Sequence, residues 1–151
     1  MIIPDKDNII ISKSPKETLA LAQKISRKLE GGEVIALNGE LGSGKTTFIK
    51  GLAKSSAVKE EITSPTFVVL KSYQGKIKDK EIVLVHIDAY RINNIDDIKS
   101  VGIEDYLERN DVVMVVEWAE RIKEILPADL YQINFKFIDE NTREISYDFN
   151  N

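Results

Sequence analysis

The stretch that decides the fold is Val34-Ile35-Ala36-Leu37-Asn38-Gly39-Glu40-Leu41-Gly42-Ser43-Gly44-Lys45-Thr46. From Gly39 onward it fits the phosphate-binding loop pattern G-x-x-x-x-G-K-[S/T] at every defined position. The apolar run before the loop is typical of a buried strand. After the loop, one face of a helix is indicated by Phe48, Ile49, Leu52 and Ala53. Strand, glycine loop and helix are the context that this motif needs, so the stretch predicts a nucleoside triphosphate site.

The residue types in the loop explain the expected chemistry. Glycines let the backbone wrap closely around phosphates, and the N–H groups at the start of a helix bind anions. Lys45 is expected to reach the β- and γ-phosphates, and the hydroxyl of Thr46 to ligate Mg2+. We expect the nucleotide to contact the whole loop and the residue after it: Gly39, Glu40, Leu41, Gly42, Ser43, Gly44, Lys45, Thr46 and Thr47.

Composition narrows the class of protein. A chain of 151 residues predicts a single domain, residues 1–151, with a substantial core. The absence of cysteine excludes disulfides, thiolate zinc sites and a cysteine nucleophile, and it is compatible with the cytoplasm. A net charge of −4 argues against general nucleic-acid binding, so we expect no DNA partner. No apolar run has membrane-spanning length and no leader is recognisable, so we expect no membrane association.

The remaining patterns predict an α/β fold. A capped helix starts at Ser14-Pro15-Lys16-Glu17 and is expected to end at Gly31-Gly32, and the helix after the loop should reach about Ser55. Further expected elements are strands at 67–73 and 82–88 with a turn from Gly75, short helices at 96–100 and 103–109, a strand at 112–117, a helix at 118–126, and a hairpin of 131–138 with 143–149. Two antiparallel hairpins require a mixed central sheet, and we expect a three-layer P-loop NTPase domain.

Two expected strands end in carboxylates, at Asp88 and Glu117. An acid at the carboxyl end of a strand lies where α/β proteins bind ligands. Asp88 is the candidate for acting on Mg2+ directly or through water. Glu117 is either a second Mg2+ ligand or the group that orients the attacking water, so the expected catalytic set is Lys45, Asp88 and Glu117. Surface charges that cap helices are the alternative explanation of both acids.

Three further features have both a functional and a structural explanation. Ser64, Pro65 and Thr66 follow the loop helix, where nucleotide switches present a hydroxyl, although a proline turn explains them too. His86, the only histidine, shares a strand face with Asp88, and a structural role is favoured over a chemical one. Trp118 either stacks on a base or packs in the core, and packing is favoured.

The motifs occur in an order that resembles the bacterial TsaE family, also called YjeE or YdiB. The resemblance spans nearly the whole chain and rests on the phosphate loop and on four further segments: Ser64-Pro65-Thr66-Phe67, His86-Ile87-Asp88-Ala89-Tyr90-Arg91, Gly102-Ile103-Glu104-Asp105-Tyr106 and Val116-Glu117-Trp118-Ala119-Glu120-Arg121. It implies the ATPase component in making N6-threonylcarbamoyladenosine at tRNA adenosine 37. It further implies that ATP and Mg2+ are bound, that hydrolysis acts as a switch on the partners TsaB and TsaD, and that tRNA is met only indirectly.

The alternatives were weighed on the arginines and on missing motifs. A small-molecule or nucleoside kinase shares the loop and the size but usually needs an arginine-bearing lid, and no such cluster is visible. A GTPase is disfavoured because no N-K-x-D motif occurs, and a nucleotide-binding scaffold stays open. Arg91, three residues after Asp88, is the nearest candidate for an arginine acting in cis. Its weakness as a candidate predicts slow hydrolysis by the isolated chain.

Overall fold

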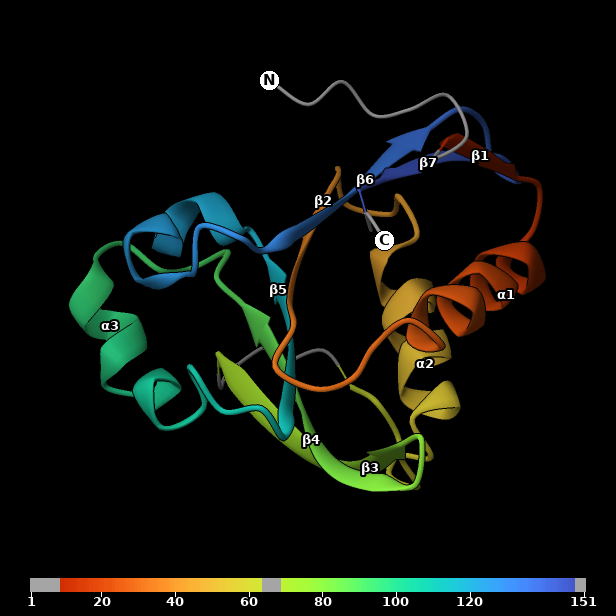
Figure 1. Cartoon of the computed structure of the whole chain (residues 1–151). Helices are drawn as coiled ribbons and strands as arrows, with labels where there is room; N and C mark the ends of the chain where they lie inside the picture. Colours follow the sequence, from red (N-terminus) through yellow and green to blue (C-terminus); the bar gives the residue numbers. More distant parts are fainter. Residues whose placement is uncertain (1–8, 64–68, 149–151) are drawn as a thin grey trace.

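The computed structural model describes residues 9–63 and 69–148. These residues form one seven-stranded sheet in the order β1-β7-β6-β2-β5-β4-β3 (Figure 1). The strands are β1 Ile9–Ser12, β2 Val34–Asn38, β3 Leu70–Ile77, β4 Lys80–Asp88, β5 Val112–Glu117, β6 Tyr131–Phe137 and β7 Arg143–Tyr147. The helices are α1 Pro15–Ser26, α2 Lys45–Ser55 and α3 Ile95–Lys99, and two 3-10 segments are η2 Ile103–Asp105 and η3 Ala119–Ile125.

The sheet is mixed, as the sequence predicted. Its centre is parallel, because β2 pairs in parallel with both β5 and β6 and β5 pairs in parallel with β4. Both edges are antiparallel: β3 runs back along β4 on one side, and β7 and β1 follow β6 on the other. The carboxyl ends of β2, β4 and β5 therefore meet at one edge of the sheet, where α/β proteins bind ligands.

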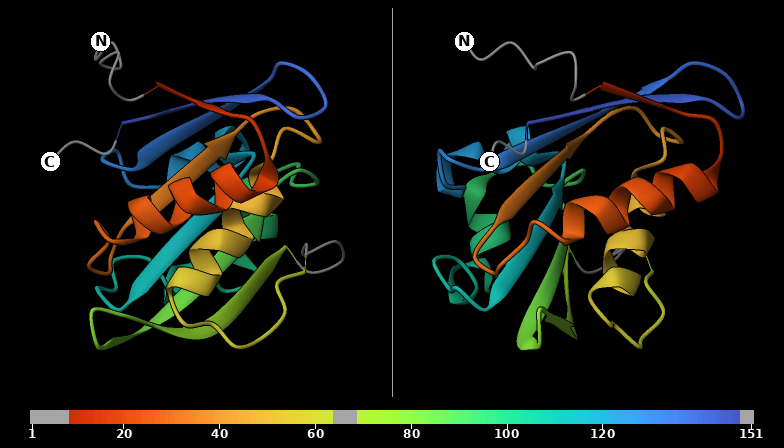
Figure 2. Two further views of the ribbon diagram at one scale, coloured as in Figure 1. Left: turned by 90° about the vertical axis from the view of Figure 1, so that its right-hand side faces the viewer. Right: turned by 45° about the vertical axis from the view of Figure 1, so that its right-hand side comes forward.

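Helices cover the two faces of the sheet and make three layers (Figures 1 and 2). Alternate residues of a strand point to opposite faces, and β2 shows this directly. Ile35 and Leu37 pack with Leu21, Ile25 and other residues of α1 and α2. Val34 and Ala36 pack on the other face, with a cluster that includes Ile98, Ile103 and Ile122. Both apolar clusters are buried, which fixes the strands that carry the site.

The start of α1 follows the predicted capping pattern. The Glu17 N–H donates to Oγ of Ser14 (3.1 Å), and the Glu17 carboxylate accepts from the Lys13 N–H. The helix ends earlier than expected, at Ser26 instead of Gly31-Gly32. Leu29 is nevertheless fully buried beyond the helix end, because an apolar stripe reports burial and not helical backbone.

Four other sequence expectations need correction. β3 continues through Gly75 to Ile77, and the turn lies at Lys78 and Asp79, which both have positive φ. Only residues 103–105 of the expected helix at 103–109 are helical, as the 3-10 segment η2. The expected helix at 118–126 is η3, interrupted by non-helical backbone at Ile122. β1, a β-branched run at the sheet edge, was not predicted.

Length and polarity decide whether a helix could span a bilayer. In the part of the chain that the structure describes, no helix is long and apolar enough to do so.

Candidate nucleotide-binding site

The phosphate loop and the two acids meet at the carboxyl edge of the sheet. The loop leaves β2, which lies beside β5, and β5 lies beside β4. The strand register places Leu37 opposite Glu117 and Glu117 opposite Asp88. Asp88 and Glu117 are therefore neighbours next to the loop, as their positions at strand ends predicted.

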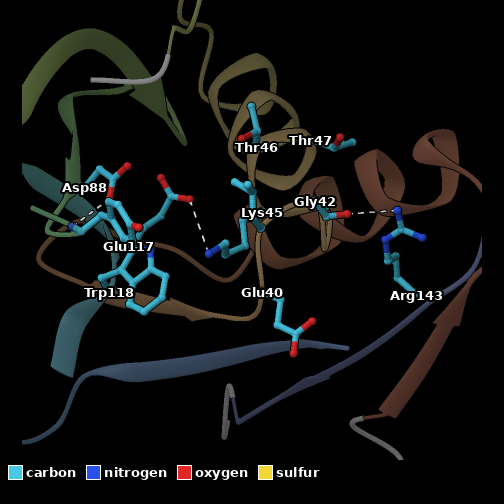
Figure 3. Close-up of a pocket in the computed structure, with 12 residues that line it drawn as sticks. Glu40, Gly42, Lys45, Thr46, Thr47, Asp88, Glu117, Trp118 and Arg143 are labelled. Carbon is cyan, nitrogen blue, oxygen red and sulfur yellow. Dashed lines mark hydrogen bonds and ion pairs between the residues drawn. The ribbon is translucent and has the colours of Figure 1, made fainter. Parts of the chain in front are cut away.

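A cavity of about 640 Å³ opens at this edge (Figure 3). Its volume lies within the range of small-molecule sites. It is lined by Glu40, Leu41, Gly42, Gly44, Lys45, Thr46, Thr47, Asp88, Tyr90, Glu117, Trp118 and Arg143. Most of the residues expected to hold nucleotide and metal are in this set. Gly39, Ser43 and His86 lie behind the lining, and exposed Arg91 is outside it among the described residues.

Lys45 projects into the centre of the cavity from the first turn of α2. Its side chain is buried, and Nζ donates to the carbonyl of Gly39 (2.7 Å). Nζ is also 4.0 Å from Oε1 of Glu117 and 5.4 Å from the ring centre of Trp118. The ammonium group is thus held between the loop backbone and the acidic end of the cavity.

Glu117 is oriented from below by His86. Both side chains are buried, and the Nε2–H of His86 donates to Oε2 of Glu117 (2.9 Å). The bond holds one carboxylate oxygen on the strand and leaves Oε1 on the side of Lys45. The geometry gives His86 a positioning role behind the acid, not a place on the cavity wall.

Asp88 carries a perturbed charge. Burial raises the pKa of its carboxyl, and the neighbouring Glu117 raises it further. The Tyr90 N–H donates to Oδ1 (3.0 Å) and, with the charges of His86 and Lys45, opposes the rise in that pKa. Two adjacent carboxylates with this imbalance would be stabilised by a cation placed between them.

Trp118 forms the side wall next to Glu117. Its backbone is left-handed, with φ of 59°, so the chain turns sharply as β5 ends. The half-buried indole contacts the Tyr90 ring (5.1 Å between ring centres), and the Arg121 guanidinium lies 5.5 Å from its centre. Trp118 packs against the core and also lines the cavity, so neither of the two sequence interpretations accounts for it alone.

Sequence reasoning missed two lining residues, Tyr90 and Arg143. Tyr90 is 54% exposed and follows Asp88 closely, so its place on the rim was inferable from the strand end. Arg143 donates from Nη2 to the carbonyl of Gly42 (3.1 Å), across 101 positions of sequence. No local pattern signals that contact, because it depends on how β6 and β7 pair. The expected switch at Ser64, Pro65 and Thr66 lies outside the described residues.

Comparison with known proteins supports this architecture. The family described as threonylcarbamoyl adenosine biosynthesis protein TsaE matches residues 12–145. The chain belongs to the TsaE family. The tRNA threonylcarbamoyladenosine biosynthesis protein TsaE of Treponema pallidum is 36% identical over 90% of this chain and 96% of its own length. The TsaE proteins of Bacillus subtilis and Aquifex aeolicus are 37% and 38% identical, over 80% and 92% of their lengths.

A solved structure extends the likeness to TsaE from sequence to fold. The crystal structure of Bacillus subtilis YdiB superposes with a TM-score of 0.71 at 34% identity, covering 92% of this chain and 82% of that one. The family resemblance drawn from the ordered motifs and the P-loop NTPase fold class are thereby confirmed. The family places this chain in the biosynthesis of tRNA threonylcarbamoyladenosine.

Proposed function

We propose that this TsaE-family chain binds Mg–ATP and hydrolyses it in the threonylcarbamoylation of tRNA adenosine 37. The observation that carries the proposal is the convergence of Lys45, Thr46, Asp88 and Glu117 on one cavity. An anion-binding loop beside two carboxylates suits phosphoryl chemistry, which depends on positioning and charge stabilisation. By the same family argument, we place the protein in the cytoplasm.

The residues present fit a divalent ion such as Mg2+. Thr46 offers a hydroxyl, and Asp88 and Glu117 offer carboxylate oxygens, which are the hard donors that Mg2+ prefers. Within the described ranges, no three His, Cys, Asp or Glu side chains form a metal cluster by themselves. That donor set suits a site in which one or two protein ligands hold the ion together with phosphate oxygens. The bound ion would neutralise charge developing on the phosphates.

The protein groups divide the work on the γ-phosphate. Lys45 balances its negative charge, and its ammonium group is already on the acidic side of the loop. Glu117, oriented by His86, is the group that would position the attacking water and accept its proton. Asp88 would act on the metal. In the net reaction, water adds to the γ-phosphorus and the bond to the β-phosphate oxygen breaks.

We further propose that hydrolysis is a switch on the partners TsaB and TsaD, with tRNA met only through them. The test measures ATP turnover by the purified chain alone and with the TsaB–TsaD pair. Slow turnover alone and a clear rise with the pair are expected, and an equal rate in both would contradict the switch. A pull-down of the pair with and without non-hydrolysable ATP checks that association depends on nucleotide. Release of ADP only when a small-molecule acceptor is added would favour a kinase instead.

A further inference from the structure

The tip of the β6–β7 hairpin holds Arg143 rigidly against the phosphate loop. Its Nη1 donates to the carbonyls of Asp139 (2.5 Å) and Thr142 (3.0 Å), both in the hairpin turn. One face of the guanidinium stacks on Phe137, 4.6 Å from the ring centre. With Nη2 bound to the carbonyl of Gly42, the plane of the group is fixed on three sides.

The bonding of this guanidinium is incomplete. Arginine has five N–H donors, and the two on Nη1 and one on Nη2 have the partners given above. Nε is buried and has no hydrogen-bond partner in the described part of the chain. A buried donor without an acceptor costs free energy, and Arg143 lines the cavity. The remaining donors suit an anionic oxygen, which arginine binds well in a bidentate way.

The position of Arg143 along the cavity selects which anion that is. In Figure 3, Lys45 points toward Glu117 and Asp88, while Arg143 lies at the other end, beside Gly42 and on the side of Thr47. The loop lysine serves the β- and γ-phosphates, so the acidic end takes the γ-phosphate. The opposite end of the same loop faces the phosphate next to the ribose.

We propose that Arg143 binds the α-phosphate of the nucleotide, using the Nε–H and the second N–H of Nη2. This inference rests on the proposed nucleotide site and identifies a binding residue that comes from the hairpin, not from the loop. Because ATP and ADP share the α-phosphate, Arg143 strengthens the binding of both equally. It does not act as an arginine finger on the γ-phosphate.

The test compares the dissociation constants of ATP and ADP for the wild-type chain and for Arg143→Gln in the presence of Mg2+. A lost charge-assisted hydrogen-bond pair should weaken both nucleotides by about 10- to 100-fold. Arg109→Gln is the matched control, since that exposed arginine pairs with Asp111 outside the cavity. Its affinities should equal those of the wild type. Circular dichroism establishes that each variant is folded.

A second measurement separates a direct contact from a loosened hairpin. The two diastereomers of ADP with sulfur on the α-phosphate are bound to wild type and to Arg143→Lys, which keeps the charge. The wild type should discriminate between the diastereomers by several-fold, because sulfur is a weak acceptor, and the lysine variant should discriminate less.

Four outcomes decide the matter. Equal losses for ATP and ADP with reduced discrimination support the α-phosphate contact. Unchanged affinities in Arg143→Gln overturn it, as does a loss confined to ATP. Failure of the wild type to bind either nucleotide overturns the proposed function itself.

Discussion

Replacing two glycines of the same loop should have unequal effects on stability. Gly39 and Gly42 both have positive φ, of 151° and 80°. A Cβ added at Gly39 would lie 2.7 Å from the carbonyl oxygen of Phe135 and 2.6 Å from Oγ of Ser43. A Cβ at Gly42 would meet nothing within 4 Å. Gly39→Ala therefore strains the contact between the loop and β6, whereas Gly42→Ala strains only its own backbone.

The magnitudes follow from these two terms. A left-handed backbone costs an alanine roughly 1–2 kcal/mol at either position. Overpacking against a backbone oxygen that belongs to the sheet adds about 1–3 kcal/mol at Gly39 alone. For a domain of this size, 1 kcal/mol corresponds to about 2–4 °C in Tm. Gly39→Ala should thus melt about 2–12 °C below Gly42→Ala.

The assay is thermal unfolding of both variants and the wild type without nucleotide, followed by circular dichroism at one scan rate. Since both substitutions add one methyl group to the same loop, each is the control for the other. Equal losses of Tm, or a larger loss in Gly42→Ala, would refute the close packing of the phosphate loop on β6.

The remaining predictions concern the acidic end of the cavity. Lys45→Ala should lose the rise in Tm that Mg–ATP gives the wild type, while Lys54→Ala, an exposed change in the same helix, should keep it; an undiminished rise in the first variant would remove Lys45 from the site. Glu117→Gln should keep the rise but turn over ATP about 100-fold or more slowly in a coupled ADP assay, and unaltered turnover would contradict its role. His86→Leu should lower turnover about tenfold with little change in KM, since it removes only the bond that orients the acid, and a change in KM alone would count against positioning. Because the pKa of Asp88 is raised in the folded state, its ionised form destabilises the protein at neutral pH, and the penalty disappears as pH falls toward its ordinary pKa of about 3.9. Asp88→Asn should therefore melt above the wild type at pH 7 and level with it near pH 4, and a constant difference in Tm would refute this cause.

Local signals in the sequence were enough to find the centre of the site. The loop pattern places Lys45 and Thr46 at a helix start, and the strand ends place Asp88 and Glu117 at the same edge. Period-two alternation put His86 and Asp88 on one face, which is the face from which His86 reaches Glu117. Each of these inferences needs only a short window of sequence and the rule that parallel strands share an edge.

Other features depended on long-range packing and could not be predicted. Arg143 reaches Gly42 only because β6 lies beside β2 and carries β7 with it. The backbone of Trp118 is left-handed where helix propensity predicted an α-helix, since the chain must turn as it leaves β5. An apolar periodicity cannot report such a turn, because it measures burial and not φ.

The arrangement of the cavity bears on where a nucleotide switch could be read. Its acids come from β4 and β5, on one side of the loop strand β2, and Arg143 comes from β7, on the other side. Hydrolysis removes the γ-phosphate and so changes the charge near Lys45, Asp88 and Glu117. Under the α-phosphate proposal, the Arg143 end holds the same group before and after hydrolysis. A partner that distinguishes ATP from ADP should therefore contact the β4–β5 rim, where Tyr90 is exposed, because the hairpin rim keeps one charge state throughout the cycle.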